Sequence, residues 1–150
     1  MATLHDEISS TIKGVISWVL EREDGTVERG EVNNLVTDLG HAFSASAYLN
    51  NSTTPFVAMA IGTSGATPQS SQTALGGEVA RKAFTTKSAT GGVVSLSTTF
   101  GPGEGTGTIA EAGTFNSTTP GGGTMFNRGV LGPFTKNAGD TITVNWQITF

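Results

Sequence analysis

The final stretch of the chain alternates between large apolar and polar side chains. Ile142, Val144, Trp146, Ile148 and Phe150 occupy every second position, with Thr, Asn, Gln and Thr between them. Only a β-strand places alternate residues on one face, so this pattern predicts a half-buried strand that gives five large side chains to a core. Because a terminal strand frays unless it is tied down, we expect it to lie in the centre of a sheet.

Similar short apolar runs recur along the chain, separated by residues typical of turns. The first two predict a hairpin, because Asp24-Gly25 between them tolerates the positive φ that a tight turn requires. Gly129 and Gly132 interrupt a later run, which indicates a bulge or a bend. About eight strands without alternating helices predict a mainly β fold, an antiparallel β-sandwich or jelly roll. The expected strands cover residues 15–22, 26–32, 56–61, 78–85, 94–100, 108–116, 124–134 and 141–150.

One helix is predicted, over residues 35–49. Thr37 provides an N-cap, and Asp38 carries negative charge in the first turn, where the helix dipole favours it. Gly40 weakens a helix by about 1 kcal/mol relative to Ala, so packing has to compensate. The residues at 3.6-residue spacing, which we expect to face the sheet, are Leu35, Leu39, Ala42, Phe43, Ser46 and Leu49.

The length of 150 residues suits one domain. We place a single β-sandwich domain at residues 13–150 and an N-terminal arm at residues 1–12. In the arm, Leu4, Ile8 and Ile12 recur every four positions and share one face of a helix. Because a helix this short is marginal in isolation, two interpretations stay open: a frayed terminus, or an arm whose apolar face docks on a neighbouring subunit.

A long polar loop is a candidate for contact with another protein. Residues 62–71 show neither helix nor strand pattern, and loops of this length in compact domains are often functional. Nothing in this loop can carry out acid–base chemistry, so a binding role is the natural interpretation. Its candidate contact residues are Ser64, Thr67 and Gln69.

Charged residues inside the predicted strands are few, and two places stand out. Arg81 and Lys82 form a small basic spot in an acidic chain. This spot indicates either a solvated or salt-bridged strand or a contact with an acidic patch of a partner. Glu111 lies among small residues and is the best single candidate for an unusual acid, although an ion pair with Arg81 or Arg128 would explain it structurally.

The composition argues against catalysis and against several classes of partner. A net charge of −4 without a basic stripe argues against a general nucleic-acid binder. No apolar run approaches the roughly 20 residues that span a bilayer. The chain has no Cys, and its two His residues have no second His or carboxylate at ligand spacing. We therefore expect no enzyme activity, no cofactor and no metal.

Five segments carry a resemblance to a known family. They are Asn34–Gly40, Ile61-Gly62-Thr63, Ala74–Arg81, Ile109–Asn116 and the closing Thr141–Phe150. In order and spacing they resemble small structural proteins of tailed bacteriophage particles, over about residues 33–150. The resemblance implies a virion protein with a jelly-roll-like fold that works by binding and has no catalytic residues.

Within that family the leading hypothesis is a capsid decoration (cement) protein. Such a protein binds the outer surface of the head, clamps adjacent subunits of the major capsid protein, and forms a dimer or trimer. We expect it on the virion surface after folding in the cytoplasm of the bacterial host. A tail-fibre or tail-adaptor component is the runner-up. A carbohydrate-binding jelly roll comes third, because such a site needs exposed aromatic rings and both Trp residues fall in core-like strands.

Overall fold

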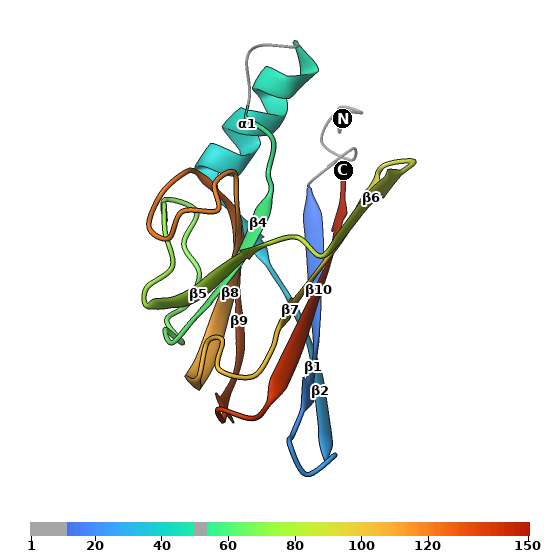
Figure 1. Ribbon diagram of the computed structural model, residues 1–150. Helices are drawn as coiled ribbons and strands as arrows, with labels where there is room; N and C mark the ends of the chain where they lie inside the picture. The colour runs from blue at the N-terminus through green and yellow to red at the C-terminus, as the bar shows by residue number, and fades with distance from the viewer. Residues whose placement is uncertain (1–11, 50–53) are drawn as a thin grey trace, which may run out of the picture.

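The computed structural model describes residues 12–49 and 54–150, which fold into two five-stranded antiparallel sheets packed face to face. The single helix among these residues lies at one end of the sandwich, beside the second sheet (Figure 1). The prediction of a mainly β protein, an antiparallel β-sandwich with one helix, is confirmed.

The first sheet is built around the closing strand of the chain. β10 (Thr141–Thr149) is paired along its whole length with β1 (Lys13–Glu21) on one side, and from Ile142 onward with β7 (Val93–Phe100) on the other. β2 (Val27–Asn33) and β6 (Thr86–Thr90) form the edges. The expected central position of the last strand is confirmed. The first hairpin is confirmed too, and its turn contains Gly25 at a φ of 87°.

The second sheet has β8 (Gly107–Phe115) at its centre, between β9 (Met125–Lys136) and β4 (Ala58–Gly62). β5 (Glu78–Ala83) forms one edge, and the short β3 (Leu35–Val36) forms the other. The pairing of β8 with β9 is irregular between Ile109 and Glu111, and Gly132 of β9 adopts a φ of 30° at that place. The bulge predicted from the glycines is therefore present.

The chain crosses from one sheet to the other at both sides of the sandwich. Between β5 and β6, the amide of Phe84 donates to the segment that enters β4, and the next amide, that of Thr85, donates to β7 in the first sheet. Between β2 and β3, the amide of Asn34 donates to β1, and Leu35 then pairs with β9. Adjacent edges of the two sheets are therefore joined by continuous main chain.

The core lies between the inner faces of the two sheets. Ile142, Val144, Trp146 and Ile148 of β10 are buried there, as their alternation predicts. Phe150, the fifth side chain expected on this face, is 51% exposed. That part of the prediction is wrong because Phe150 follows the end of β10 and lines a groove at the end of the sandwich instead of the closed core.

The sequence pattern misses two of the ten strands that the described residues form. β3 is only two residues long, and the pattern assigns Leu35 and Val36 to the start of the helix. β6 reads Thr-Lys-Ser-Ala-Thr with every residue exposed, so no apolar alternation marks it. The predicted strand over residues 78–85 is too long, because the chain leaves the second sheet after Ala83.

The helix α1 (Asp38–Tyr48) begins later than predicted, but Thr37 is its N-cap as expected. The hydroxyl oxygen of Thr37 accepts the amide of Gly40 at 2.9 Å, and the hydroxyl donates to the carbonyl of Met125 at 2.7 Å. The predicted packing face is partly wrong. Leu39 and Leu49 are exposed, whereas Gly40 is buried.

The helix approaches the sheet through Gly40 instead of through its leucines. A Cβ at this position would lie 3.0 Å from Cγ1 of Val36 and closer still to the carbonyl oxygen of Phe126. A main-chain carbonyl cannot swing away as a flexible side chain can, so only glycine lets the helix lie this close to β9. This contact supplies the packing that compensates for the low helix propensity of glycine.

Gly40→Ala is expected to lower the free energy of unfolding by about 1–3 kcal/mol. The clash with the carbonyl of Phe126 outweighs the gain of about 1 kcal/mol that Ala brings to a helix. Urea denaturation measures the difference. Ala45→Gly, at an exposed position of the same helix, is the matched control and costs about 1 kcal/mol through propensity alone. A stabilised Gly40→Ala protein would contradict the close approach.

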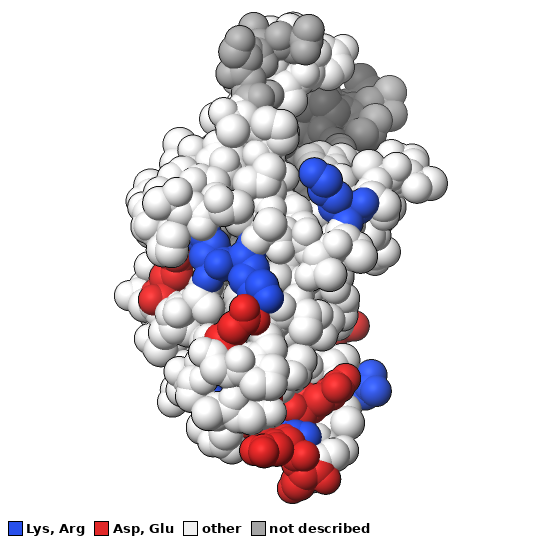
Figure 2. Space-filling model, viewed as in Figure 1, with Lys and Arg blue, Asp and Glu red and all other residues white. Residues whose placement is uncertain are grey.

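Paired charges gather near the end of the sandwich opposite α1, whereas much of the rest of this face is uncharged (Figure 2). Arg22 forms ion pairs with Asp140 at 2.9 Å and with Glu28 at 2.6 Å. Asp140 also accepts the amides of Asn137 at 2.8 Å and Glu23 at 3.1 Å, so it joins the β1–β2 turn to the β9–β10 turn. The Asn137 amide, followed by Arg22, holds the pKa of Asp140 below its ordinary value of 3.8.

Asp140→Asn tests how this contact responds to acid. A carboxyl group whose pKa is lowered by folding stabilises the protein above its ordinary pKa, and this contribution is lost as the pH falls through the lowered value. We expect Asp140→Asn to unfold more readily near neutral pH, and the difference from the parent protein to shrink once the pH falls below 3.8. Urea denaturation from about pH 7 to about pH 2 measures both. A difference that does not change with pH would rule out the carboxylate as its source.

Candidate protein-binding surface

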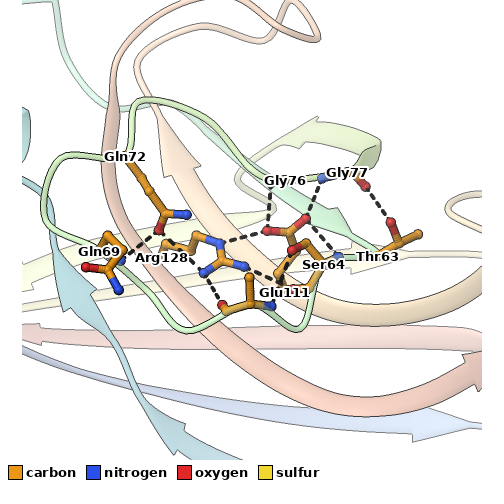
Figure 3. A network of polar contacts seen from close by, with 9 residues as sticks. Thr63, Ser64, Gln69, Gln72, Gly76, Gly77, Glu111 and Arg128 are labelled. Atoms are coloured by element: carbon orange, nitrogen blue, oxygen red, sulfur yellow. Dashed lines mark hydrogen bonds and ion pairs between the residues drawn. The ribbon is translucent and has the colours of Figure 1, made fainter.

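A buried ion pair lies beneath the long polar loop between β4 and β5. Glu111 of β8 and Arg128 of β9 are 0% and 1% exposed, and Arg128 Nε donates to Glu111 Oε2 at 2.7 Å (Figure 3). Arg128 was one of the two partners that the sequence suggested for Glu111. The acid is therefore explained by a structural pair.

Glu111 ties the two ends of the loop together. Its Oε1 accepts the amides of Ser64 at 3.1 Å and Gly77 at 2.8 Å, and its Oε2 accepts the amide of Gly76 at 3.0 Å. One carboxylate therefore receives three main-chain amides and the guanidinium of Arg128. These amides come from the first and the last residues of the loop, so the carboxylate fixes both ends at the same point.

Arg128 holds the first part of the same loop. Its guanidinium donates to the carbonyl of Ser64 at 3.0 Å and to the carbonyl of Ala66 at 2.8 Å. The side-chain oxygen of Gln72 lies 3.5 Å from the guanidinium and accepts the amide of Gln69 at 2.9 Å (Figure 3). We call residues 63–77, with Glu111 and Arg128 beneath them, the anchored loop.

Small residues allow the loop to come this close. A Cβ on Gly62 would lie 2.5 Å from Oε1 of Glu111, and a Cβ on Gly76 would lie 2.5 Å from the Cβ of Ser64. Real side chains do not tolerate such separations, so the sequence places glycine there. Leu75 adds one apolar anchor, packed with Phe115 and neighbouring residues of the second sheet.

The outer side of the anchored loop offers two of the three predicted contact residues. Thr67 and Gln69 are exposed. Ser64 is half-buried, and its hydroxyl oxygen accepts the amide of Ala66 at 3.3 Å, so it shapes the loop from within. The loop is also joined to α1, because the amide of Asp38 donates to the carbonyl of Ser70 at 2.8 Å.

Arg81 is enclosed and is not offered to a partner. Its side chain is 0% exposed, forms an ion pair with Glu78, and donates to the carbonyls of Ser117 and Gly122. Its guanidinium carbon lies 3.7 Å from the centre of the Phe115 ring, a cation–π contact. The interpretation of a salt-bridged strand therefore describes Arg81, and its inclusion among the contact residues is corrected.

Lys82 is also used within the subunit, although its side chain is 39% exposed. Its ammonium group donates to the carboxylate of Glu104 at 2.8 Å and to the carbonyl of Thr99 at 3.0 Å. The hydrogen bond from Lys82 is the main cause that holds the pKa of Glu104 below its ordinary value. The two cations that are adjacent in the sequence therefore do not form one basic patch.

Of the three predicted contact residues in the arm, the structure describes only Ile12. Leu4 and Ile8 lie outside the described residues, whereas Ile12 is half-buried and packs against the main core. Among residues 12–49 and 54–150, no group of three His, Asp or Glu residues is placed to hold a metal ion. No helix in the described chain is long and apolar enough to cross a membrane.

Sequence reasoning found the loop and its ion pair but not the way they are joined. The roles of Gln72, Leu75 and Gly76-Gly77 were missed, because each depends on which main-chain groups of the loop turn inward. The Gly-Gly pair directly after a lone Leu is the one signal that could have shown where the loop closes on the sheet.

Glu111→Gln is expected to lower the free energy of unfolding by about 3–5 kcal/mol, because the variant leaves Arg128 as an unpaired buried charge. Glu31→Gln makes the same chemical change at an exposed position and should stay within about 0.5 kcal/mol of the parent protein. Hydrogen exchange adds a local measurement: the amides of Ser64, Gly76 and Gly77 should exchange faster in Glu111→Gln. Similar stability in the two variants would show that the pair does not anchor the loop.

Comparisons with known proteins give no relative on which to base a function: no family model, no curated protein and no solved structure matches the chain. The geometry of the anchored loop is therefore the main structural basis for a functional conclusion. It presents exposed polar side chains on a backbone that a buried ion pair holds in place.

Proposed function

We propose that the protein is a structural component of a tailed-bacteriophage virion, a capsid decoration (cement) protein. In this role it binds the outer surface of the head and clamps adjacent subunits of the major capsid protein. The observation that carries the proposal is the anchored loop, whose backbone is held from beneath by Glu111 and Arg128. The resemblance of about residues 33–150 to small phage structural proteins suggests the class of partner.

A loop that is rigid before binding favours this role. Ordering a flexible loop at an interface costs free energy for every side chain and residue that is immobilised. The hydrogen bonds to Glu111 and Arg128 order the loop during folding, so this cost does not fall on the binding step. Thr67 and Gln69 then meet the partner from fixed positions.

Weak contacts are sufficient for a protein that binds a repeating lattice. A ligand that binds only the assembled head stabilises it by RT ln(1 + [L]/Kd) at each site, and a head offers many identical sites. A dimer or trimer strengthens each attachment further, because linked contacts act together. Only 13% of the residues are charged, and much of the surface in Figure 2 is uncharged, which favours polar contacts of this kind over strongly steered ones.

The test is binding to heads from which the protein has been removed. We expect the purified protein to bind these heads in large copy number and to raise the temperature at which they rupture. Thr67→Arg should fold normally and bind at least about ten-fold more weakly, because a long charged side chain on a rigid loop prevents close contact. Thr90→Arg, on the exposed edge strand of the other sheet, is the matched control. Sedimentation with the heads measures binding.

Three outcomes would contradict parts of the proposal. A handful of copies located on the tail would replace head decoration by the tail-adaptor hypothesis. Equal binding of Thr67→Arg and the parent protein would remove the anchored loop from the interface. Heads that rupture at the same temperature with and without bound protein would exclude a clamping role.

A further inference from the structure

An apolar groove lies at the end of the sandwich that carries α1. It has a volume of about 460 Å³, and the described residues leave it open to solvent. Aromatic rings from the second sheet, from α1, from connecting segments and from the residue after β10 line it: Phe43, Phe56, Phe84, Phe126 and Phe150. Exposed apolar surface of this kind usually marks a site where another chain segment or molecule binds.

The rings form a continuous row from α1 to the last residue of the sequence. The ring centres of Phe43 and Phe56 are 4.7 Å apart, those of Phe56 and Phe126 are 5.1 Å apart, and those of Phe126 and Phe150 are 6.2 Å apart. Leu39 and Tyr48 of α1, and Leu49 directly after it, are exposed as well. Residues 12–49 and 54–150 therefore leave the core of the sandwich uncovered at this end.

The N-terminal residues enter the fold beside this groove. Lys13 pairs with Thr149, so the residue before Lys13 lies next to the strand end that leads to Phe150. Ile12 is that residue, and it packs against the same core cluster to which Ile148 and Phe126 belong. The described chain therefore begins near the side of the groove.

The sequence of this segment fits the groove. Leu4 and Ile8 lie eight and four residues before Ile12, and this spacing places all three on one side in either a helix or a strand. As a helix, the segment from Leu4 to Ile12 spans about 12 Å. An apolar cavity of about 150 Å³ holds a benzene-sized group, so the groove has room for both aliphatic side chains.

We propose that residues 1–11 fold back over the groove of their own subunit and place Leu4 and Ile8 against its phenylalanine rings. Ile12 is already packed on the core, so only a few residues separate the anchored end from Ile8. A short connection of this kind gives an effective concentration in the millimolar range, which favours the subunit's own arm over that of another copy. The arm then completes the core at its open end. The proposal concerns the isolated subunit and does not depend on the partner proposed above.

Disulfide trapping tests the position of the arm, because the chain contains no Cys. Ala89 pairs with Val94, a core residue that lines the groove, so its side chain lies on the groove side of β6. The double variant Ile8→Cys with Ala89→Cys should form an intrachain disulfide under mild oxidation at least about ten-fold faster than Ile8→Cys with Thr26→Cys. Thr26 lies in the β1–β2 turn at the opposite end of the sandwich.

Each alternative result would overturn the proposal. Disulfide-linked dimers on a non-reducing gel would mean that the arm of a second copy fills the groove. Equal rates for the two pairs would mean that the arm does not dock there.

A second measurement uses the folded protein without oxidation. Leu4→Ser with Ile8→Ser should increase the fluorescence of a bound hydrophobic dye several-fold and lower the Tm by a few degrees, because the groove is uncovered. Ser9→Ala with Ser10→Ala changes the polar positions of the same segment and is the matched control. Unchanged dye fluorescence in Leu4→Ser with Ile8→Ser, together with a native circular dichroism spectrum, would also overturn the proposal.

Discussion

Burial of one face of β10 is the interaction on which the rest of the fold depends. Ile142, Val144, Trp146 and Ile148 all point from the centre of the first sheet into the core. Each contributes about 1.5–3 kcal/mol relative to exposure, and the net stability of a whole domain is only about 5–15 kcal/mol. The last strand in the sequence therefore holds the first and the seventh strands in register, and the second sheet packs on the surface that they form together.

The Glu111–Arg128 pair has a different role from the core. Buried ion pairs add little net stability compared with apolar side chains of the same size, because both charges lose their hydration. Instead, Glu111 accepts hydrogen bonds from main-chain amides of the loop, and Arg128 donates hydrogen bonds to its carbonyls. The loop has one well-buried apolar residue, Leu75. A loop of mostly Ser, Thr, Gln and Gly has little apolar surface beyond Leu75 with which to fix its conformation, and the hydrogen bonds of the two charges fix the rest.

The sequence predicts those parts of the protein in which a local pattern decides the structure. The alternation in β10, the Asp24-Gly25 turn and the Thr37 cap all depend on short-range chemistry, and all were found. β6 is an edge strand with both faces wet, so no pattern reveals it. The packing of α1 through Gly40 was missed because side-chain periodicity cannot show where a missing side chain lets two backbones meet. The same limit applies to the candidate site. The sequence offers Arg128 as a partner for Glu111, but it does not show that Arg81 is enclosed, because that depends on the carbonyls of Ser117 and Gly122 in a loop distant in the sequence.

Two of the crossings of the chain between the sheets, from β2 to β3 and from β5 to β6, have a mechanical consequence. In most of the sandwich the sheets are held together by side-chain contacts, which can slip past one another. At Phe84–Thr85 on one side and at Asn34–Leu35 on the other, covalent main chain passes from sheet to sheet and is hydrogen-bonded to both. These two places resist sliding of one sheet over the other. A force that pulls on one sheet is carried to the other through peptide bonds, so the two layers bear tension as one body.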